Sequence, residues 1–135
     1  MKVYGEQRGT ALCDFDGDGR VDLVVSQNGA ASKLYRNVGG KPGLRVRLVG
    51  AGSNGSGIGA VVRLGAGGKW GAAREVHGGS GYWSQDSAVP VMSVGGTTAE
   101  QIQVRWPGGK LTTNNVPADV REIRLTAEGK IEKQK

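Results

Sequence analysis

A short acidic segment near the start of the chain constrains its fold more than any other feature. Four aspartates alternate with small or turn-forming residues over nine positions, and apolar runs at 10–13 and 23–25 flank them. Carboxylates this close repel one another unless a cation lies between them. Oxygen ligands at positions one, three, five and nine, with a backbone carbonyl at position seven, suit Ca²⁺. The predicted calcium ligands are Asp14, Asp16, Asp18, Arg20 and Asp22.

Other interpretations of this segment fit less well. Mg²⁺ prefers a strict octahedron and keeps several waters. An EF-hand needs a glutamate at position twelve, where this chain has Val25, and the β-branched run 23–26 predicts a strand rather than a helix. A solvated turn that binds nothing is the plain alternative, but Gly17 and Gly19 fall where the chain must wrap around an ion. We therefore predict a strand–loop–strand calcium hairpin.

Residues 14–23 resemble the calcium loop of FG-GAP/VCBS repeats, the β-propeller blades of integrin-like and related extracellular proteins. Strands are expected before the loop, at 22–27 and at 32–37, with a turn at Asn28 and Gly29. These elements supply most of one blade. A single blade cannot bury both its faces. The resemblance therefore implies either neighbouring propeller blades in a longer parent protein or docking of the hairpin on the domain that follows.

After a glycine-rich boundary at 39–43, the pattern becomes regular β structure. Clean alternation at 44–48, with apolar residues on one side and arginines on the other, predicts a half-buried strand. Glycine is abundant, at 25 residues, and falls between short apolar runs, as at the 65–71 turn. The fold class is all-β, a sandwich or barrel, with at most a short helical turn at 97–100. The further strands are expected at 60–64, 73–76, 89–94, 101–106, 110–113 and 121–125.

Four motifs in this second part occur in a distinctive order, at 54–60, 74–82, 84–85 and 104–110. In order and spacing they resemble the ASPIC/UnbV domain, a module that follows FG-GAP/VCBS repeats in secreted bacterial proteins and in cartilage acidic protein-like proteins. The resemblance covers about residues 42–126. It implies an extracellular, calcium-binding role in adhesion or interaction, and it implies no reaction.

The charge distribution leaves several partners open. The net charge is +6, although four of the twelve acidic residues lie in the loop, so the rest of the chain is more basic still. Such a surface could meet acidic polysaccharide, anionic lipid or nucleic acid, or simply keep the chain soluble. Adjacent basic residues gather only in the tail, so we do not expect nucleic-acid binding. Six arginines on the expected strands could form a basic face if they share one side: Arg45, Arg47, Arg63, Arg105, Arg121 and Arg124.

Enzymatic residues are sparse, and we expect no enzyme. Cys13 and His77 are the single cysteine and histidine, and Cys13 is best read as a small buried hydrophobe. Ser80, His77 and Asp86 are the residue types of a catalytic triad, but their closeness in the sequence does not give them the spatial arrangement that a triad needs. The glycine-rich segment 55–59 precedes a strand, whereas a phosphate-binding loop opens a helix.

An aromatic pair on a glycine-rich loop offers a candidate ligand contact. Tyr82 and Trp83, with Gln85 beside them, could stack on a sugar or enter a partner's pocket, and equally one ring could plug the end of the sandwich. Trp106, at a strand end before a Pro-Gly-Gly turn, is expected in the core.

The sequence thus predicts three parts: an FG-GAP/VCBS-like calcium repeat at 1–40, an ASPIC/UnbV-like β domain at 41–128 and a charged tail at 129–135. The expected function is that of a secreted or cell-surface calcium-binding interaction module, with an extracellular protein or glycan as partner. The alternative is a glycan-binding accessory module of a carbohydrate-active protein. No apolar stretch is long enough to span a membrane, and the first five residues lack the apolar core of an export signal, which must then lie outside this chain.

Overall fold

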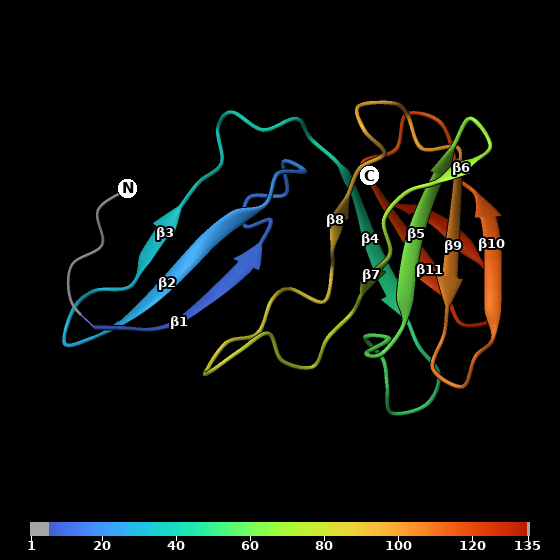
Figure 1. Ribbon diagram of the computed structural model, residues 1–135. Coiled ribbons are helices and arrows are strands. Elements are labelled where there is room, and N and C mark those ends of the chain that lie inside the picture. Colours follow the sequence, from blue (N-terminus) through green and yellow to red (C-terminus); the bar gives the residue numbers. More distant parts are fainter. Residues whose placement is uncertain (1–5, 135) are drawn as a thin grey trace.

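The computed structural model describes residues 6–134, which form strands and loops with no helix (Figure 1). The all-β prediction is confirmed. The expectation about an export signal in residues 1–5 lies outside the described part. The strands are β1 (Glu6–Cys13), β2 (Asp22–Asn28), β3 (Lys33–Tyr35), β4 (Leu44–Val49), β5 (Val61–Ala66), β6 (Lys69–Trp70), β7 (Arg74–Glu75), β8 (Val91–Met92), β9 (Gln101–Arg105), β10 (Leu111–Asn115), β11 (Glu122–Thr126) and β12 (Ile131–Gln134).

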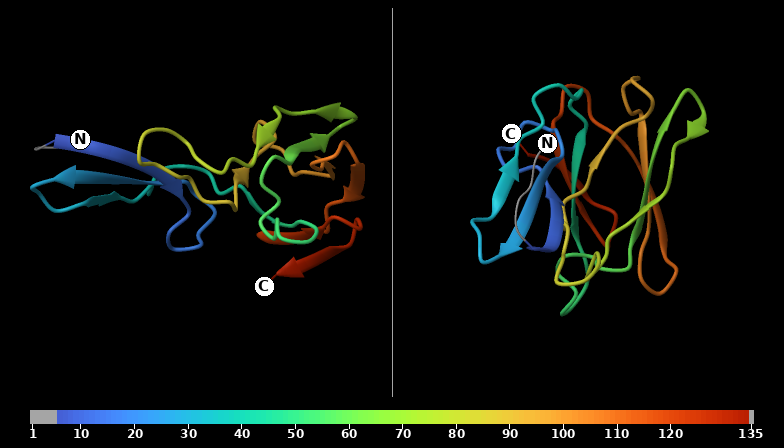
Figure 2. Two further views of the ribbon diagram at one scale, coloured as in Figure 1. Left: turned by 90° about the horizontal axis from the view of Figure 1, so that it is seen from below. Right: turned by 60° about the vertical axis from the view of Figure 1, so that its left-hand side comes forward.

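Nine of these strands, β4 to β12, form two facing sheets, a β-sandwich and not a closed barrel (Figure 2). One sheet has the order β10-β9-β5-β6, with β7 also paired to β5, and the other has the order β12-β11-β4-β8. Alternate residues point inward and make one core. Each fully buried aliphatic side chain contributes about 1.5–3 kcal/mol to folding. The largest of the fully buried aliphatic side chains are Val46, Val62, Leu64, Ile102, Val104, Ile123 and Leu125.

Trp106 lies in this core, as predicted. It is 3% exposed, and its indole N–H donates to Thr112 Oγ1 at 2.9 Å. Because the single polar atom of the ring has a partner, the whole side chain can be buried at the end of β9 without an unsatisfied group.

The remaining strands form a separate sheet, β1-β2-β3, at the other end of an elongated molecule (Figure 2). Its β1 edge is tied to the segment 84–87. The Thr10 N–H donates to Ser84 Oγ at 3.0 Å, and the Leu12 N–H donates to Asp86 Oδ1 at 2.8 Å. The Ser87 N–H donates in turn to the Leu12 carbonyl at 2.9 Å. The hairpin therefore docks on the domain that follows it.

Three segments expected to be turns or tail have the following structure. The 65–71 turn is shorter than expected, because β5 continues to Ala66, β6 begins at Lys69, and only Gly67 and Gly68 turn the chain, at φ 56° and 72°. Residues 97–100 are not helical; an antiparallel bridge joins Val94 and Thr97 there. The charged tail contains the strand β12, which pairs with β11.

Candidate metal centre

The acidic loop connects β1 to β2 and turns tightly over residues 14–21. Gly17 and Gly19 have φ values of 74° and 83°, a left-handed conformation that glycine adopts without steric cost. Gly19 is also packed against the linker, since a Cβ there would lie 3.0 Å from the Gly43 carbonyl oxygen. The Gly43 N–H donates to the Gly19 carbonyl at 2.8 Å, so the loop is seated on the start of the sandwich.

Three of the predicted ligands come together. Asp14, Asp16 and Asp18 each offer a carboxylate oxygen, and the three oxygens lie within 4.8 Å of one another. The Asp14 side chain is 1% exposed. One of its oxygens accepts from the Gly19 N–H at 2.9 Å, whereas its Oδ1 is buried with no hydrogen-bond partner among the described residues. A buried carboxylate oxygen without a partner destabilises the fold, and a cation or an ordered water bound there would satisfy it.

Each of these aspartates also meets an arginine. Arg45 Nη1 lies 2.5 Å from Asp14 Oδ2, and Arg36 Nε lies 2.5 Å from Asp16 Oδ2. The guanidinium of Arg20 pairs with Asp18. Desolvation raises the pKa of Asp18, but the hydrogen bonds and the charge of Arg20 together outweigh it and hold that pKa below its usual value. Three arginines, of which only Arg20 belongs to the loop, therefore neutralise much of its negative charge.

Asp22 is buried and closes the loop. It is 1% exposed, its Oδ2 accepts from the Phe15 N–H at 2.9 Å, and its Oδ1 accepts from the Asn37 N–H at 2.8 Å. These bonds fix the loop and the end of the hairpin sheet together. Asp22 is not one of the three mutually close carboxylates, although each of its oxygens keeps a lone pair for a cation. Arg20 Nε donates to the Asn37 carbonyl at 2.7 Å.

Sequence reasoning missed the residues that approach the loop from a distance. Arg45 reaches Asp14 from β4, and Asn37 meets Asp22 from the linker after β3. The alternation of 44–48 placed Arg45 on an outward face but gave no sign of which residue it would meet.

The aromatic pair is exposed and does not plug the sandwich. Tyr82 is 70% and Trp83 is 82% exposed, with ring centroids 5.8 Å apart and planes inclined at 30°. Trp83 has a φ of 51°, which is uncommon for a residue with a side chain. The Ser80 N–H donates to the Ser84 carbonyl at 3.0 Å and closes the loop beneath the rings. Gln85, next to them, is exposed as well.

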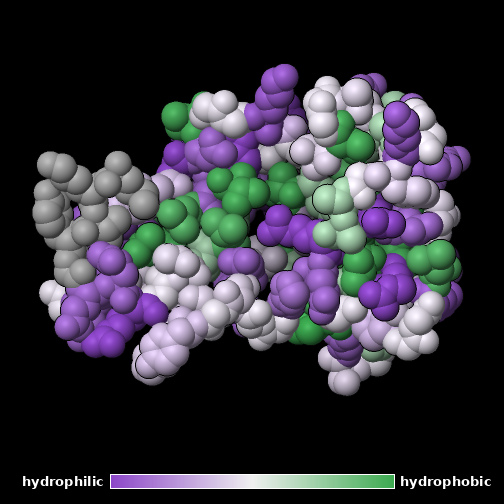
Figure 3. All heavy atoms as spheres, in the orientation of Figure 1, coloured by the Kyte–Doolittle hydropathy of each residue, from purple (hydrophilic) through white to green (hydrophobic). Residues whose placement is uncertain are grey.

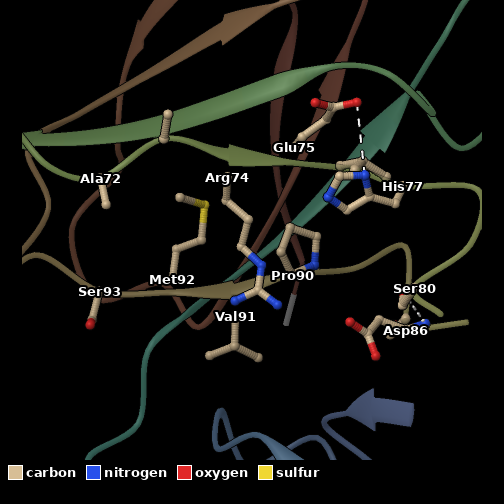
Figure 4. Close-up of a pocket in the computed structure, with 13 residues that line it drawn as sticks. Ala72, Arg74, Glu75, His77, Ser80, Asp86, Pro90, Val91, Met92 and Ser93 are labelled. Atoms are coloured by element: carbon tan, nitrogen blue, oxygen red, sulfur yellow. Dashed lines mark hydrogen bonds and ion pairs between the residues drawn. The ribbon is translucent and has the colours of Figure 1, made fainter. Parts of the chain in front are cut away.

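His77, Ser80 and Asp86 do not form a catalytic triad (Figure 4). They line a cavity of about 570 Å³ between β7 and β8. His77 Nδ1 faces Glu75 at 3.8 Å, while the Ser80 hydroxyl accepts from the Asp86 N–H at 2.9 Å. Burial raises the pKa of the Cys13 thiol, and nearby Asp22, Asp14 and Asp86 raise it further, so this thiol is a poor nucleophile at neutral pH.

The sequence comparisons place the β-sandwich in a known family. The family model described as "ASPIC and UnbV" matches residues 50–132, which are most of the sandwich. The chain belongs to the ASPIC and UnbV family. This ASPIC/UnbV chain is also similar to cartilage acidic protein 1 of Xenopus tropicalis, at 33% identity over 83% of the chain, and of Homo sapiens, at 31% over 86%. The mouse protein of that name is 29% identical over 88%.

The ASPIC/UnbV chain corresponds to a small part of these relatives. It covers 18% of the frog protein, 18% of the human protein and 19% of the mouse protein. Residues 6–134 contain no helix long and apolar enough to cross a membrane.

Proposed function

We propose that this chain is a calcium-binding, non-enzymatic module of an extracellular protein, and that its first forty residues are an FG-GAP/VCBS-type repeat. The observation that carries the proposal is Asp14 Oδ1, a buried carboxylate oxygen that has no hydrogen-bond partner within residues 6–134 and lies beside two further carboxylates. A divalent cation would satisfy this oxygen and relieve the repulsion within the loop.

The loop offers oxygen donors only, which suits Ca²⁺ rather than a softer metal. Asp14, Asp16 and Asp18 would hold the ion, with the Arg20 carbonyl and Asp22 completing the set that the spacing predicts. Asp22 already bonds the start of the loop at Phe15 and the segment after β3 at Asn37, so the cation would hold in place a turn that is largely preformed. Its role would be structural, keeping β1 and β2 in register at the junction with the sandwich.

An extracellular role is supported by the relatives and by the domain order. The similar proteins are named for cartilage, and none of those names describes an enzyme. The hairpin sheet has the strand–loop–strand plan of one propeller blade, and in a longer parent protein other blades would continue it. The partner would be an extracellular protein or a glycan.

Calorimetric titration of Ca²⁺ and thermal unfolding with and without a chelator test the metal site. We expect binding with a raised melting temperature, since saturation at one hundred times the dissociation constant adds about 2.7 kcal/mol to stability. Asp14→Asn should abolish both effects, while Asp119→Asn, an equal charge change on an exposed residue outside the loop, should leave them intact. Arg36→Gln should strengthen binding, because it removes a cation that competes at Asp16. Absence of both heat and stabilisation in the wild type would refute the site.

A second candidate, a glycan-binding accessory module, is favoured by the exposed rings of Tyr82 and Trp83. Two rings inclined at 30° on a hydrogen-bonded loop can stack on a sugar. A glycan array with and without Ca²⁺ tests it. Glycan-binding signals that are lost in the Trp83→Ala variant would support this candidate. An array on which the wild type binds no glycan would exclude it.

A further inference from the structure

The outer face of the β10-β9-β5-β6 sheet carries polar side chains around one aromatic ring, with the exposed Leu111 on its β10 edge. The opposite side of these strands is buried in the core, since Val62, Leu64 and Val104 are at most 1% exposed. Alternation therefore turns their neighbours outward. We call this surface the Trp70 face and define it by Arg63, Trp70, Gln101, Gln103, Arg105 and Asn115.

The strand register places these residues in rows. Arg63 lies opposite Gln103, which lies opposite Thr113. Gly65 of β5 has Trp70 of β6 opposite it on one side and Gln101 of β9 opposite it on the other. Residues directly opposite each other have side chains on the same face of a sheet. This side of the sandwich is toward the reader in Figures 1 and 3, and Figure 3 shows hydrophilic side chains around small hydrophobic areas there.

Trp70 lies flat on the sheet because Gly65 leaves room for it. A Cβ on Gly65 would lie 3.0 Å from both Cε3 and Cζ3 of the indole. The ring covers the glycine, which is buried, yet Trp70 remains 38% exposed. One side of the indole thus rests on backbone and solvent reaches the remainder. A ring held in this way offers a platform for stacking at little entropic cost.

The polar groups around the ring retain most of their hydrogen-bonding capacity. Gln101 Nε2 reaches Asn115 Oδ1 only at 3.5 Å, and Gln103 Nε2 reaches Thr113 Oγ1 at the same distance, both at the weak limit. Within residues 6–134 no hydrogen bond or ion pair engages the side chain of Arg63 or Arg105. Two acidic groups lie at the margin of the face. Glu75 faces His77, and Glu100, next to Gln101, accepts from the Gly67 N–H at 3.1 Å.

From this arrangement we propose that the Trp70 face binds an acidic glycan, a chain bearing carboxylate or sulfate groups. Trp70 stacks on a sugar ring, the amides of Gln101, Gln103 and Asn115 bond its hydroxyls, and the two guanidiniums pair with its anionic groups. The excess of neutral hydrogen-bonding side chains over cations favours a polyhydroxylated chain over nucleic acid, which is bound through many phosphate contacts. This site is separate from the calcium loop and from Tyr82 and Trp83.

Affinity electrophoresis in gels containing polygalacturonate, chondroitin sulfate or neutral dextran tests the proposal. We expect retardation by at least one acidic polymer and none by dextran. The double variant Arg63→Gln with Arg105→Gln should weaken binding at least about tenfold, because each arginine makes charge-assisted bonds. The control Lys33→Gln with Lys41→Gln removes the same charge from exposed residues outside the face and should bind nearly as the wild type does.

Trp70 needs a folding control, since the ring packs on the sheet. Trp70→Ala should lose binding and Trp70→Phe should keep much of it, each judged only after its melting curve shows a folded protein. If Trp70→Ala does not fold, the arginine pair alone decides the test. The acidic loop contributes no residue to the Trp70 face, so a failed calcium site leaves this test intact.

Three results would overturn the proposal. The first is that no acidic polymer retards the protein. The second is that the arginine double variant and the lysine double variant lose equal binding affinity. The third is that single-stranded oligonucleotides bind more tightly than the polysaccharides.

Discussion

Arg45 joins the two ends of the molecule, and its removal is the sharpest test of how they are held together. It lies on β4 and is 16% exposed. Its Nη1 pairs with Asp14 Oδ2 at 2.5 Å and its Nε with Glu122 Oε2 at 2.7 Å. One guanidinium thus neutralises an acid of the loop and an acid of β11. Replacing Arg45 with methionine keeps the packing of the side-chain stem and removes both pairs.

The expected cost follows from the burial of the partners. Breaking a fully buried ion pair costs about 3–5 kcal/mol, and an exposed pair costs about 0–1 kcal/mol. Asp14 is 1% exposed and loses its arginine, whereas Glu122 keeps Arg47 at 2.9 Å. We therefore expect Arg45→Met to lower the free energy of unfolding by about 2–3 kcal/mol.

Arg47→Met is the matched control, because Arg47 lies on the same strand and shares Glu122. It is 47% exposed, so its loss should cost less than about 1 kcal/mol. Urea unfolding of both variants, in chelator so that no metal masks the effect, measures the difference. Equal costs for the two variants, or a cost below 1 kcal/mol for Arg45→Met, would refute the conclusion that Arg45 holds the loop to the sandwich.

Three further predictions concern the sandwich. Burial raises the pKa of Glu122, but hydrogen bonds from Arg45 and Arg47 outweigh it and lower that pKa. The stabilisation is therefore present above the unfolded value of about 4.3 and is lost as the pH falls through the folded pKa. The deficit of Glu122→Gln in urea should shrink as the pH is lowered through this range, and a constant deficit would contradict this. Trp106→Phe removes the indole bond to Thr112 and should cost about 1–2 kcal/mol by the same assay. Ile123→Ala, at a residue 0% exposed, should cost about 2–5 kcal/mol, and a smaller loss would mean that the core refills.

Where alternation was strong, the fold could be predicted from the sequence. The pattern of 44–48 predicted β4, and its inward residues, Val46 among them, lie in the core. The acidic spacing likewise predicted the loop that gathers three aspartates. In these segments the pattern of apolar and polar residues agrees with the burial of the side chains in the folded protein, so the sequence alone predicts the structure.

Elements fixed by distant contacts could not be found in this way. Strand β6 has only two residues in a glycine-rich stretch, and it exists because Trp70 packs on Gly65. Strand β12 is an edge strand with one apolar residue, Ile131, so its charges predict a solvated tail. The parallel pairing of β11 with β4 joins residues far apart in the chain, and no local signal records such a register.

The contacts between β1 and the segment 84–87 have a consequence for the behaviour of the molecule in solution. Strand edges with free N–H groups are templates on which strands of other molecules can pair. Along β1, the N–H groups of Thr10 and Leu12 are already occupied by Ser84 and Asp86, and the Leu12 carbonyl is occupied by Ser87. The loop that carries the exposed aromatic rings thus also shields this edge from edge-to-edge aggregation.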